Sequence, residues 1–213
     1  MDMELLAAAD DSAREYKGIS GSLVAKNHQE TTMPSAKPDT DLGAVFDAHV
    51  ASEFATPDLD ATMATMTESP TLTHVPALTG GNGYEAVRSF YGKYFHGHWP
   101  ADTNMVRVSR TVAQDRVIDE IVVSFTHDVE MPAMLPGVKP TGRKVELPHV
   151  VVVGFVGDKI AYERIYWDQA SLLAQIGLLD PATLPITGIE QARRLLDPTL
   201  PSNELIHRAE KHR

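Results

Sequence analysis

The 213-residue chain contains no cysteine, so disulfide bonds and metal sites with thiolate ligands are excluded. Basic residues are also scarce, because 19 Lys and Arg stand against 29 Asp and Glu, and the formal net charge is −10. Phosphate backbones and anionic lipid surfaces both select clustered positive charge. We therefore expect neither a nucleic acid nor a membrane as a partner.

Long apolar runs are missing as well. No stretch approaches the roughly 20 residues needed to span a bilayer. Residues 1–9 are acidic, and their apolar stretch is too short for a secretory signal. The default expectation is a cytoplasmic protein. Hydrophobic residues make up 43% of the chain and charged residues 23%, values typical of a globular protein.

The pattern of the chain predicts three parts. Residues 1–38 are interpreted as an arm, because glycines and prolines follow a short helical stretch at 1–17. Such an arm either lacks order or packs on a neighbouring subunit. Residues 39–180 carry the periodic patterns of one domain, and residues 181–213 form a C-terminal helical extension.

Helical spacing marks several segments. Apolar residues recur at this spacing over 42–50, which predicts an amphipathic helix. Thr56-Pro57 is predicted to begin a second helix, and residues 82–85, which resemble a capping box, a third. In the extension, Thr187 and Ser202 are the predicted caps of two further helices.

Strand spacing dominates after residue 100. The predicted strands are 71–78, ending at Gly80-Gly81, then 103–112, 117–130, 143–156 and 159–167, followed by a helix at 168–175. Helices followed by consecutive strands favour an α+β fold over a parallel α/β sheet. Long twisted strands beside a few helices tend to enclose a pocket.

Three motifs, at 80–91, 136–143 and Lys159–Asp168, resemble the SnoaL-like polyketide cyclases of the nuclear transport factor 2-like superfamily. The segment Lys159–Asp168, with its aromatic pair and aspartate, resembles the closing strand of that family. Residues 136–143 are similar to its Pro-Thr-Gly-Lys/Arg loop, and residues 80–91 to its third helix. The resemblance covers residues 41–176.

The resemblance implies a cone: a curved, mostly antiparallel sheet wrapped by helices around a deep apolar pocket, often dimeric across the sheet. Relatives include cyclases, isomerases and dehydratases, together with members without known activity. In the cyclases an aspartate near the end of the last strand acts as acid/base, and Asp168 matches it by position. Tyr166 stands where the family often has histidine.

The candidate catalytic residues are Asp168, His127 and His149. A carboxylate in an apolar pocket can remove a proton next to a carbonyl, and a neutral imidazole can donate to the developing enolate. Asp168 also precedes a predicted helix, so a helix cap remains the competing interpretation. For the histidines, the competing interpretation is a partly buried structural role.

The candidate substrate-binding residues combine one histidine with aromatic rings that suit a flat apolar ligand. They are His74, Tyr84, Tyr91, Trp99, Phe125, Tyr166 and Trp167. Core packing is the alternative for each of them. A metal site built from His74, His127, His149 and Asp168 is the sharper alternative, but the sequence does not favour it, because these residues show no close ligand spacing. The His96–His98 pair is assigned to a surface loop.

Two function classes remain open from the sequence. The first is a cofactor-independent cyclase, isomerase or hydratase acting on a flat apolar carbonyl compound by acid/base catalysis. The second is a non-catalytic small-molecule-binding or dimerisation module. We expect no cofactor, a small hydrophobic molecule as ligand, and a homodimer, which the resemblance and the apolar run at 150–153 favour.

Overall fold

The computed structural model describes residues 40–211, so the predicted N-terminal arm and its helix at 1–17 lie outside the described residues. One mixed sheet of six strands dominates the described part, in the order β2-β1-β6-β5-β4-β3. β1 runs parallel to β6, and every other neighbouring pair is antiparallel. The strands are β1 Met66–His74, β2 Thr79–Asn82, β3 Asn104–Val112, β4 Arg116–Thr126, β5 Lys144–Val156 and β6 Lys159–Trp167.

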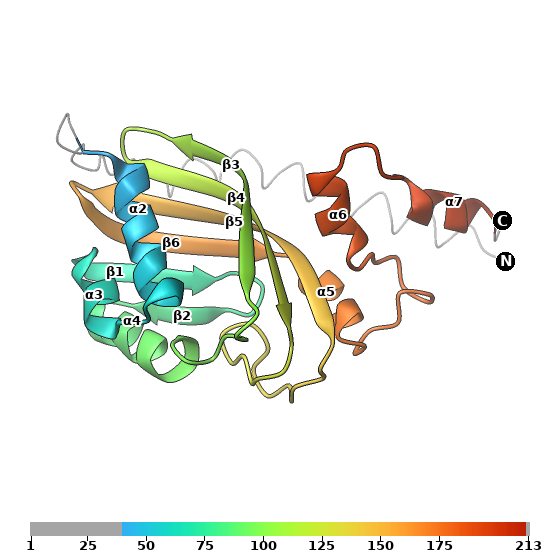
Figure 1. Cartoon of the computed structure of the whole chain (residues 1–213), viewed down its shortest axis with the longest axis horizontal. Helices are drawn as coiled ribbons and strands as arrows, with labels where there is room; N and C mark the ends of the chain where they lie inside the picture. Colours follow the sequence, from blue (N-terminus) through green and yellow to red (C-terminus); the bar gives the residue numbers. More distant parts are fainter. Residues whose placement is uncertain (1–39, 212–213) are drawn as a thin grey trace, which may run out of the picture. The chain divides into compact units, whose positions relative to one another are not determined.

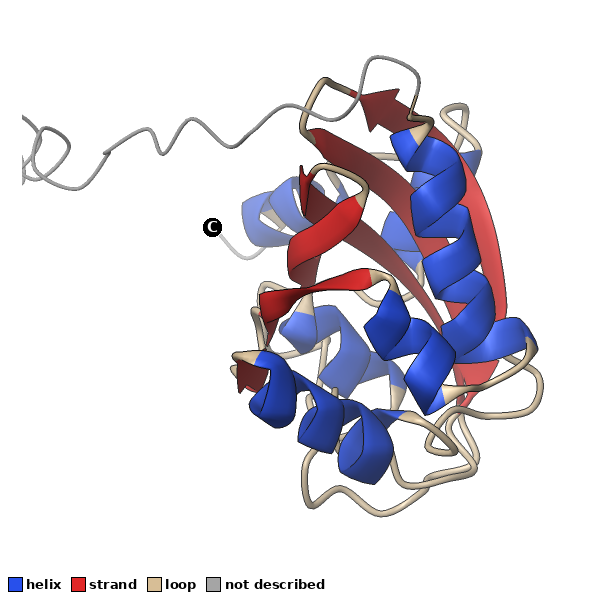
Figure 2. Ribbon diagram, turned by 90° about the vertical axis from the view of Figure 1, so that its left-hand side faces the viewer, coloured by secondary structure: helices blue, strands red, loops and turns tan. Residues whose placement is uncertain are grey.

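The helices before β3 lie against one face of this curved sheet (Figures 1 and 2). They are α2 Leu42–Val50, α3 Leu59–Ala64 and α4 Tyr84–Phe90. Two of them continue into π-helical turns, η1 Ala51–Ala55 after α2 and η2 Tyr91–Phe95 after α4. The later helices are α5 Gln169–Gln175, α6 Glu190–Leu196 and α7 Glu204–Glu210. The α+β prediction is confirmed.

The alternation of side chains along β5 and β6 separates an inner from an outer face. Val151 and Val153 are buried under the helices, whereas Val150 is 40% exposed on the opposite face. Val150 pairs with Tyr166 of β6, which is 42% exposed. The run at 150–153 is therefore apolar on both faces but covered on only one within the described residues.

Several predicted boundaries were wrong in the first half of the domain. Asp58, and not Thr56, caps α3, because its carboxylate accepts from the backbone N–H groups of Asp60 and Ala61. The first strand begins at Met66, and Gly80-Gly81 do not end it but lie inside β2. A Cβ at Gly81 would meet the backbone of Ala86 at 2.6 Å, so glycine allows β2 to pack closely on α4.

Other predicted caps and one strand end also differ from the structure. Within residues 40–211, no side chain caps α4, which follows Gly83, or α6 and α7, which begin after Ile189 and Asn203. β4 ends at Thr126, so His127 lies in the following loop. The backbone N–H of His127 donates to the carbonyl oxygen of Arg143, and its carbonyl accepts from residues 141 and 142, which closes that loop.

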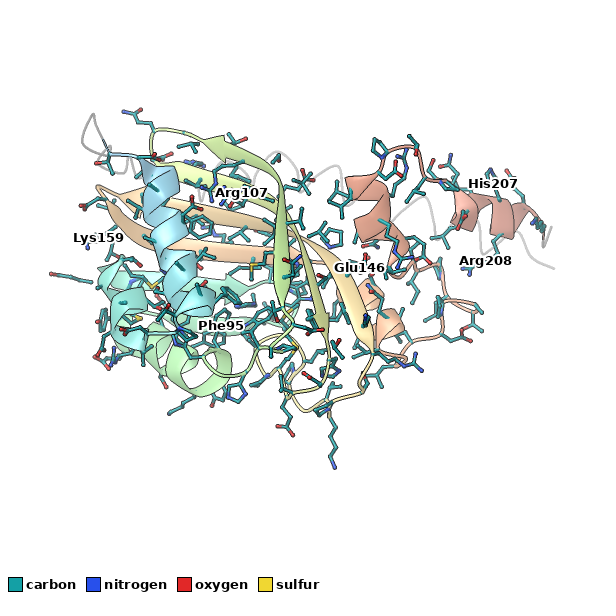
Figure 3. The ribbon with its side chains drawn as sticks, viewed as in Figure 1. Phe95, Arg107, Glu146, Lys159, His207 and Arg208 are labelled. Atoms are coloured by element: carbon teal, nitrogen blue, oxygen red, sulfur yellow. The ribbon has the colours of Figure 1, made fainter. Side chains whose placement is uncertain are left out.

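Polar contacts act both within the extension after α5 and between the extension and the domain. Arg208 of α7 donates to the backbone carbonyls of Pro181 and Leu184 (Figure 3). Arg193 of α6 forms an ion pair with Glu146 of β5 at 3.2 Å. Within residues 40–211, no helix has the length and apolar character that a bilayer crossing would require.

Candidate functional site

An apolar cavity of about 160 Å³ lies between the inner face of the sheet and the helices α2, η1 and η2. Phe54, Phe95 and Trp99 form one wall through edge-to-face contacts, with ring centroids 5.1 to 5.6 Å apart. Aliphatic residues of the sheet, including Leu72 and Val151, form the other wall. The volume suits a molecule of one or two rings.

A buried polar cluster interrupts this lining. Glu53 and Glu163 both reach the cavity wall, and His49 lies between them. His49 Nε2 is 2.8 Å from Glu163 Oε1 and 3.2 Å from Glu53 Oε1. Tyr91 Oη is also 3.2 Å from the same nitrogen. All four side chains are buried, so the cluster forms a polar end of a largely apolar site.

Local structure explains how these residues meet. His49 and Glu53 are four residues apart where α2 passes into the π-helical turn η1, so both project to one side. Tyr91 opens η2, the other π-helical turn; such turns are frequent at functional sites. Glu163 stands between Leu72 and Val153 in the sheet register, on the inner face.

The hydrogen bonds around His49 fix the orientation of its ring. Thr65 Oγ1 donates its hydrogen to the carbonyl oxygen of Thr62 at 2.7 Å, so it accepts from His49 Nδ1 at 2.6 Å. Nε2 is therefore the ring atom that faces the carboxylates. Glu163 Oε1, although 2.8 Å from Nε2, lies off the hydrogen-bonding direction and accepts no hydrogen bond within the described part of the chain.

The charges of the cluster shift two pKa values. Burial lowers the pKa of His49, but the attraction of Glu163 and Glu53 outweighs burial and raises that pKa well above its ordinary value. Burial, reinforced by the same carboxylates, raises the pKa of Tyr91 well above its ordinary value. At neutral pH the ring of His49 is a cation, and Tyr91 keeps its hydrogen and can donate.

Two neutral histidines line another part of the cavity. Burial lowers the pKa of His149 to about 4, and burial together with nearby His149 lowers that of His74 to about 3. His149 Nδ1 donates to the carbonyl oxygen of Leu147 at 3.0 Å, while His74 Nδ1 has no partner among the described residues. The ring of Trp167 lies about 5.5 Å from both imidazoles.

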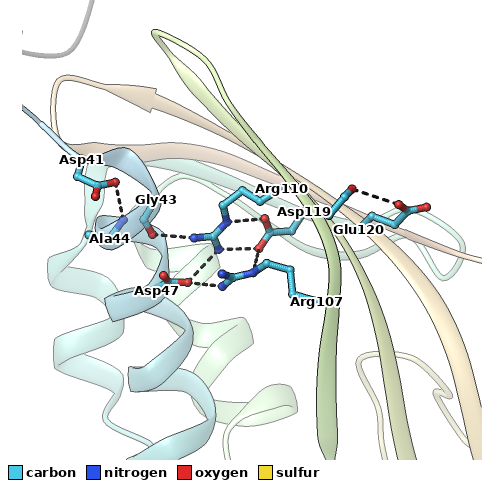
Figure 4. A network of polar contacts seen from close by, with 9 residues as sticks. Asp41, Gly43, Ala44, Asp47, Arg107, Arg110, Asp119 and Glu120 are labelled. Carbon is cyan, nitrogen blue, oxygen red and sulfur yellow. Dashed lines mark hydrogen bonds and ion pairs between the residues drawn. The ribbon is translucent and has the colours of Figure 1, made fainter. Parts of the chain in front are cut away.

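An ion-pair network lies where α2 crosses β3 and β4 (Figure 4). Arg110 donates through two nitrogens to the buried carboxylate of Asp119, both at 2.6 Å, and also binds Asp47 at 2.9 Å. Arg107, labelled in Figures 3 and 4, pairs with Asp47 and approaches Asp119 at 3.5 Å. Arg107, which is half-exposed, and Asp119, which is buried, both also line the cavity, so this network forms part of the cavity rim.

Asp168 lies at the start of α5 and does not line the cavity. Its Oδ1 accepts from the backbone N–H groups of Ala170 and Ser171 at 2.9 and 3.1 Å, and Oδ2 accepts from Gln191 Nε2 at 2.5 Å. Of the two interpretations offered by the sequence, this geometry matches the helix cap. The base role at this position stays a prediction that the geometry does not favour.

The other predicted site residues divide into two groups. His74, His149, Tyr91 and Trp99 line the cavity. The others lie elsewhere. His127 is buried in its loop beside Thr141, and Phe125 packs against Trp99. Trp167 packs against His74 and His149, whereas Tyr84 and Tyr166 are exposed. His74, His127, His149 and Asp168, the alternative set of metal ligands, do not form a group among the described residues.

Sequence reasoning missed the polar cluster itself. The spacing of His49 and Glu53 is a usable signal, because residues four apart share a helix face, but the predicted helix at 42–50 ended before Glu53. The signal at Glu163 is weaker. In the strand Lys159–Trp167 it shares a face with Ile165 and Trp167, which predicts an inward side chain. Nothing in the sequence indicated that these residues would meet.

A curved mixed sheet covered by helices around an apolar cavity is the nuclear transport factor 2-like α+β fold. The chain belongs to the SnoaL-like domain family, whose model matches residues 46–163, more than half of the sequence. No curated protein sequence matches the chain.

Solved structures from several bacteria share the fold. A proposed SnoaL-like polyketide cyclase from Jannaschia sp. CCS1 is 18% identical, with a TM-score of 0.52 over 68% of this chain and 99% of its own. An NTF2-like protein of unknown function from Burkholderia pseudomallei K96243 is 16% identical, with a TM-score of 0.51 over 65% and 98%. TsrD from Streptomyces laurentii is 14% identical, with a TM-score of 0.50 over 65% and 96%. Identities this low show a common fold only.

Proposed function

We propose that the cavity binds a small, flat, mostly apolar carbonyl compound and that Glu163 removes a proton next to the carbonyl group. The observation that carries this proposal is Glu163 Oε1, which is buried at the wall of an apolar cavity and accepts no hydrogen bond within the described residues. The ring of His49 lies 2.8 Å from this oxygen but off the hydrogen-bonding direction, so the oxygen keeps a lone pair for a substrate proton, as a general base requires.

The neighbours of Glu163 supply the other groups that such a step requires. The proton moves from the carbon next to the carbonyl to Glu163 Oε1, and the electron pair moves to the carbonyl oxygen, giving an enolate. Neutral Tyr91 can donate a hydrogen bond to that oxygen, because its hydroxyl lies at the same end of the cavity. Return of the proton to another carbon is an isomerisation, and attack of the enolate on a second carbonyl is a cyclisation.

Ligand binding is tested with saturation-transfer NMR on the bicyclic ketones 2-indanone and 2-tetralone. Val151→Phe fills the cavity from β5, and Val150→Phe adds the same volume to the outer face of the same strand. We expect binding to the wild type and to Val150→Phe, and loss of binding in Val151→Phe. Equal binding by both variants, or no binding to the wild type, would overturn the proposed pocket.

The second candidate function is a non-catalytic binding module. It is favoured by the cap geometry of Asp168, since the position that matches the family's catalytic aspartate does not reach the cavity. The two candidates differ in one observable. An enzyme exchanges the α-hydrogens of a bound ketone with solvent, whereas a binding module leaves them at the rate seen in buffer.

We also propose a cytoplasmic homodimer that acts without nucleic acid or membrane, with the domain at 39–180 and an extension at 181–213. Exposed Val150 and Tyr166, which pair across β5 and β6, support an interface on the outer face of the sheet. Light scattering should give twice the mass of one chain for the wild type, and a single chain for the double substitution Val150→Asp, Tyr166→Asp. A monomeric wild type would refute the dimer.

A further inference from the structure

Three donor atoms of the buried cluster are spaced as ligands of one metal ion. Nε2 of His49 and single carboxylate oxygens of Glu53 and Glu163 all lie within 4.8 Å of one another. Nε2 is 2.8 and 3.2 Å from the two oxygens. Ligands bonded at about 2.1 Å to one ion lie about 3 Å apart when they subtend a right angle. The three side chains can therefore converge on an ion with little movement.

The surroundings of His49 are those of a metal-binding histidine. Metal-bound imidazoles usually donate their second N–H to a fixed acceptor, which holds the ring in place. Here Nδ1 donates to Thr65 Oγ1 at 2.6 Å, and that hydroxyl is in turn anchored to the carbonyl oxygen of Thr62. Nε2 is thereby aimed at the two carboxylates.

A separate observation concerns the hydrogen bonding of Glu163, whose nearest cationic group is the imidazole of His49 at 2.8 Å. Glu163 is only 4% exposed, and its Oε1 accepts no hydrogen bond among the described residues. A buried carboxylate oxygen without a donor is costly. A divalent ion in place of the hydrogen on His49 Nε2 would bond to that oxygen and balance both carboxylates, whereas the imidazolium balances only one of the two negative charges.

We infer that His49, Glu53 and Glu163 bind one divalent transition-metal ion at the polar end of the cavity. One imidazole nitrogen and two carboxylate oxygens suit Mn²⁺, Fe²⁺, Co²⁺ or Zn²⁺. Mg²⁺ and Ca²⁺ prefer sites made of oxygen ligands alone, so they should bind weakly. The ion takes the place of the hydrogen on Nε2 and reaches the cluster through the cavity, whose wall includes both glutamates.

Ion binding would regulate the site proposed above. Glu163 cannot be a metal ligand and a free base through the same oxygen, so a bound ion stops proton transfer by Glu163. Only this consequence rests on the proposed function, because the ion site itself follows from the donor atoms. A failed ion site and a failed base can therefore be told apart.

The test uses the full-length protein after treatment with a chelator, titrated with Co²⁺ in equilibrium dialysis and by visible absorption. We expect one Co²⁺ per chain, absorption bands of a site with nitrogen and oxygen ligands, and a higher melting temperature. Glu53→Gln and Glu163→Gln keep the side-chain shape and should each weaken Co²⁺ binding at least tenfold. Glu120→Gln, on the outer face and bonded to Ser109, is the matched control and should bind as the wild type does.

Binding of 2-indanone to the same metal-free protein separates the two proposals. Absence of saturable Co²⁺ binding below millimolar concentration, with 2-indanone still bound, overturns the ion site alone. Unchanged Co²⁺ binding in both glutamine variants, whose folding is checked by circular dichroism, also overturns it. Co²⁺ bound with the expected losses, but no ketone bound, supports the ion site and refutes the proposed substrate pocket.

Discussion

Glu163 Oε1 lies 2.8 Å from His49 Nε2, and both side chains are buried under the helices on the inner face of the sheet. One residue comes from the last strand and the other from the first described helix. The contact therefore joins the two ends of the domain at the polar end of its cavity.

Loss of His49 should destabilise the fold strongly. His49→Ala leaves Glu53 and Glu163 buried without a cation, and breaking a buried ion pair in this way costs about 3 to 5 kcal/mol. Urea denaturation measures the change in the free energy of unfolding. The double variant with Glu163→Gln should lose less than the sum of the single losses, because one buried charge is then removed.

The control for this prediction is His207→Ala, because His207 is exposed on α7 (Figure 3). It should leave the free energy of unfolding unchanged. A loss below about 1 kcal/mol for His49→Ala would contradict the ion-pair account.

Acid should weaken the fold through His74 and His149. Burial lowers the pKa of His149 to about 4 and, together with His149, that of His74 to about 3. Unfolded histidines titrate near pH 6.5, so below that pH the unfolded state binds protons that the folded state does not. The stability contribution is present in full above pH 6.5 and falls as the pH drops towards 4, by about 3 kcal/mol at His149.

His49 does not mask this effect, because its raised pKa gives the opposite sign: its contribution is complete below pH 6.5 and is lost only as the pH rises. The measurement is the slope of unfolding free energy against pH between 6.5 and 4. His149→Gln should flatten that slope and His207→Gln should not. Identical slopes in the two variants would argue against a neutral, buried His149.

The rim network should stabilise the fold more than a surface pair does. Arg110→Met leaves the carboxylate of Asp119 buried without its two-point partner, and we expect a loss of about 3 kcal/mol. The matched control is Arg116→Met. Arg116 also donates through two nitrogens to one carboxylate, but Asp115 is 30% exposed, so the free energy of unfolding should change little. Equal melting temperatures for the two variants would show that burial of Asp119 contributes nothing.

Asp168 should matter for stability and not for ligand binding. Asp168→Ala removes the acceptor for two backbone N–H groups of α5 and for Gln191, with an expected loss of about 1 kcal/mol or slightly more. Its affinity for 2-indanone should equal that of the wild type, measured by the same NMR titration. A weaker affinity for 2-indanone, with an unchanged free energy of unfolding, would show that Asp168 contributes to ligand binding.

The sequence predicted most of the sheet because its signals there are local. Lys159–Trp167 has strand alternation and follows a Gly157-Asp158 turn, and the structure gives a strand with the same bounds. The predicted helix starts were wrong where two nearby residues could each cap the helix, as Thr56 and Asp58 could for α3. The family model and the sheet then confirmed the expected superfamily.

The site was harder to predict because it depends on distant contacts. The aromatic and histidine lining could be predicted in part, as Tyr91, Trp99, His74 and His149 all reach the cavity. The cluster could not, since His49 and Glu163 are far apart in the sequence and meet only after α2 packs across the sheet. The π-helical turn that presents Glu53 also has no local sequence signal that we could identify.

The most direct test of the account is α-hydrogen exchange of 2-indanone in heavy water, followed by proton NMR with metal-free wild type, Glu163→Gln and Asp168→Asn. The account predicts that the wild type and Asp168→Asn exchange the hydrogens at least tenfold faster than buffer, and that Glu163→Gln does not exceed the buffer rate. Exchange that survives in Glu163→Gln but is lost in Asp168→Asn would contradict the account and assign the base to the end of the last strand.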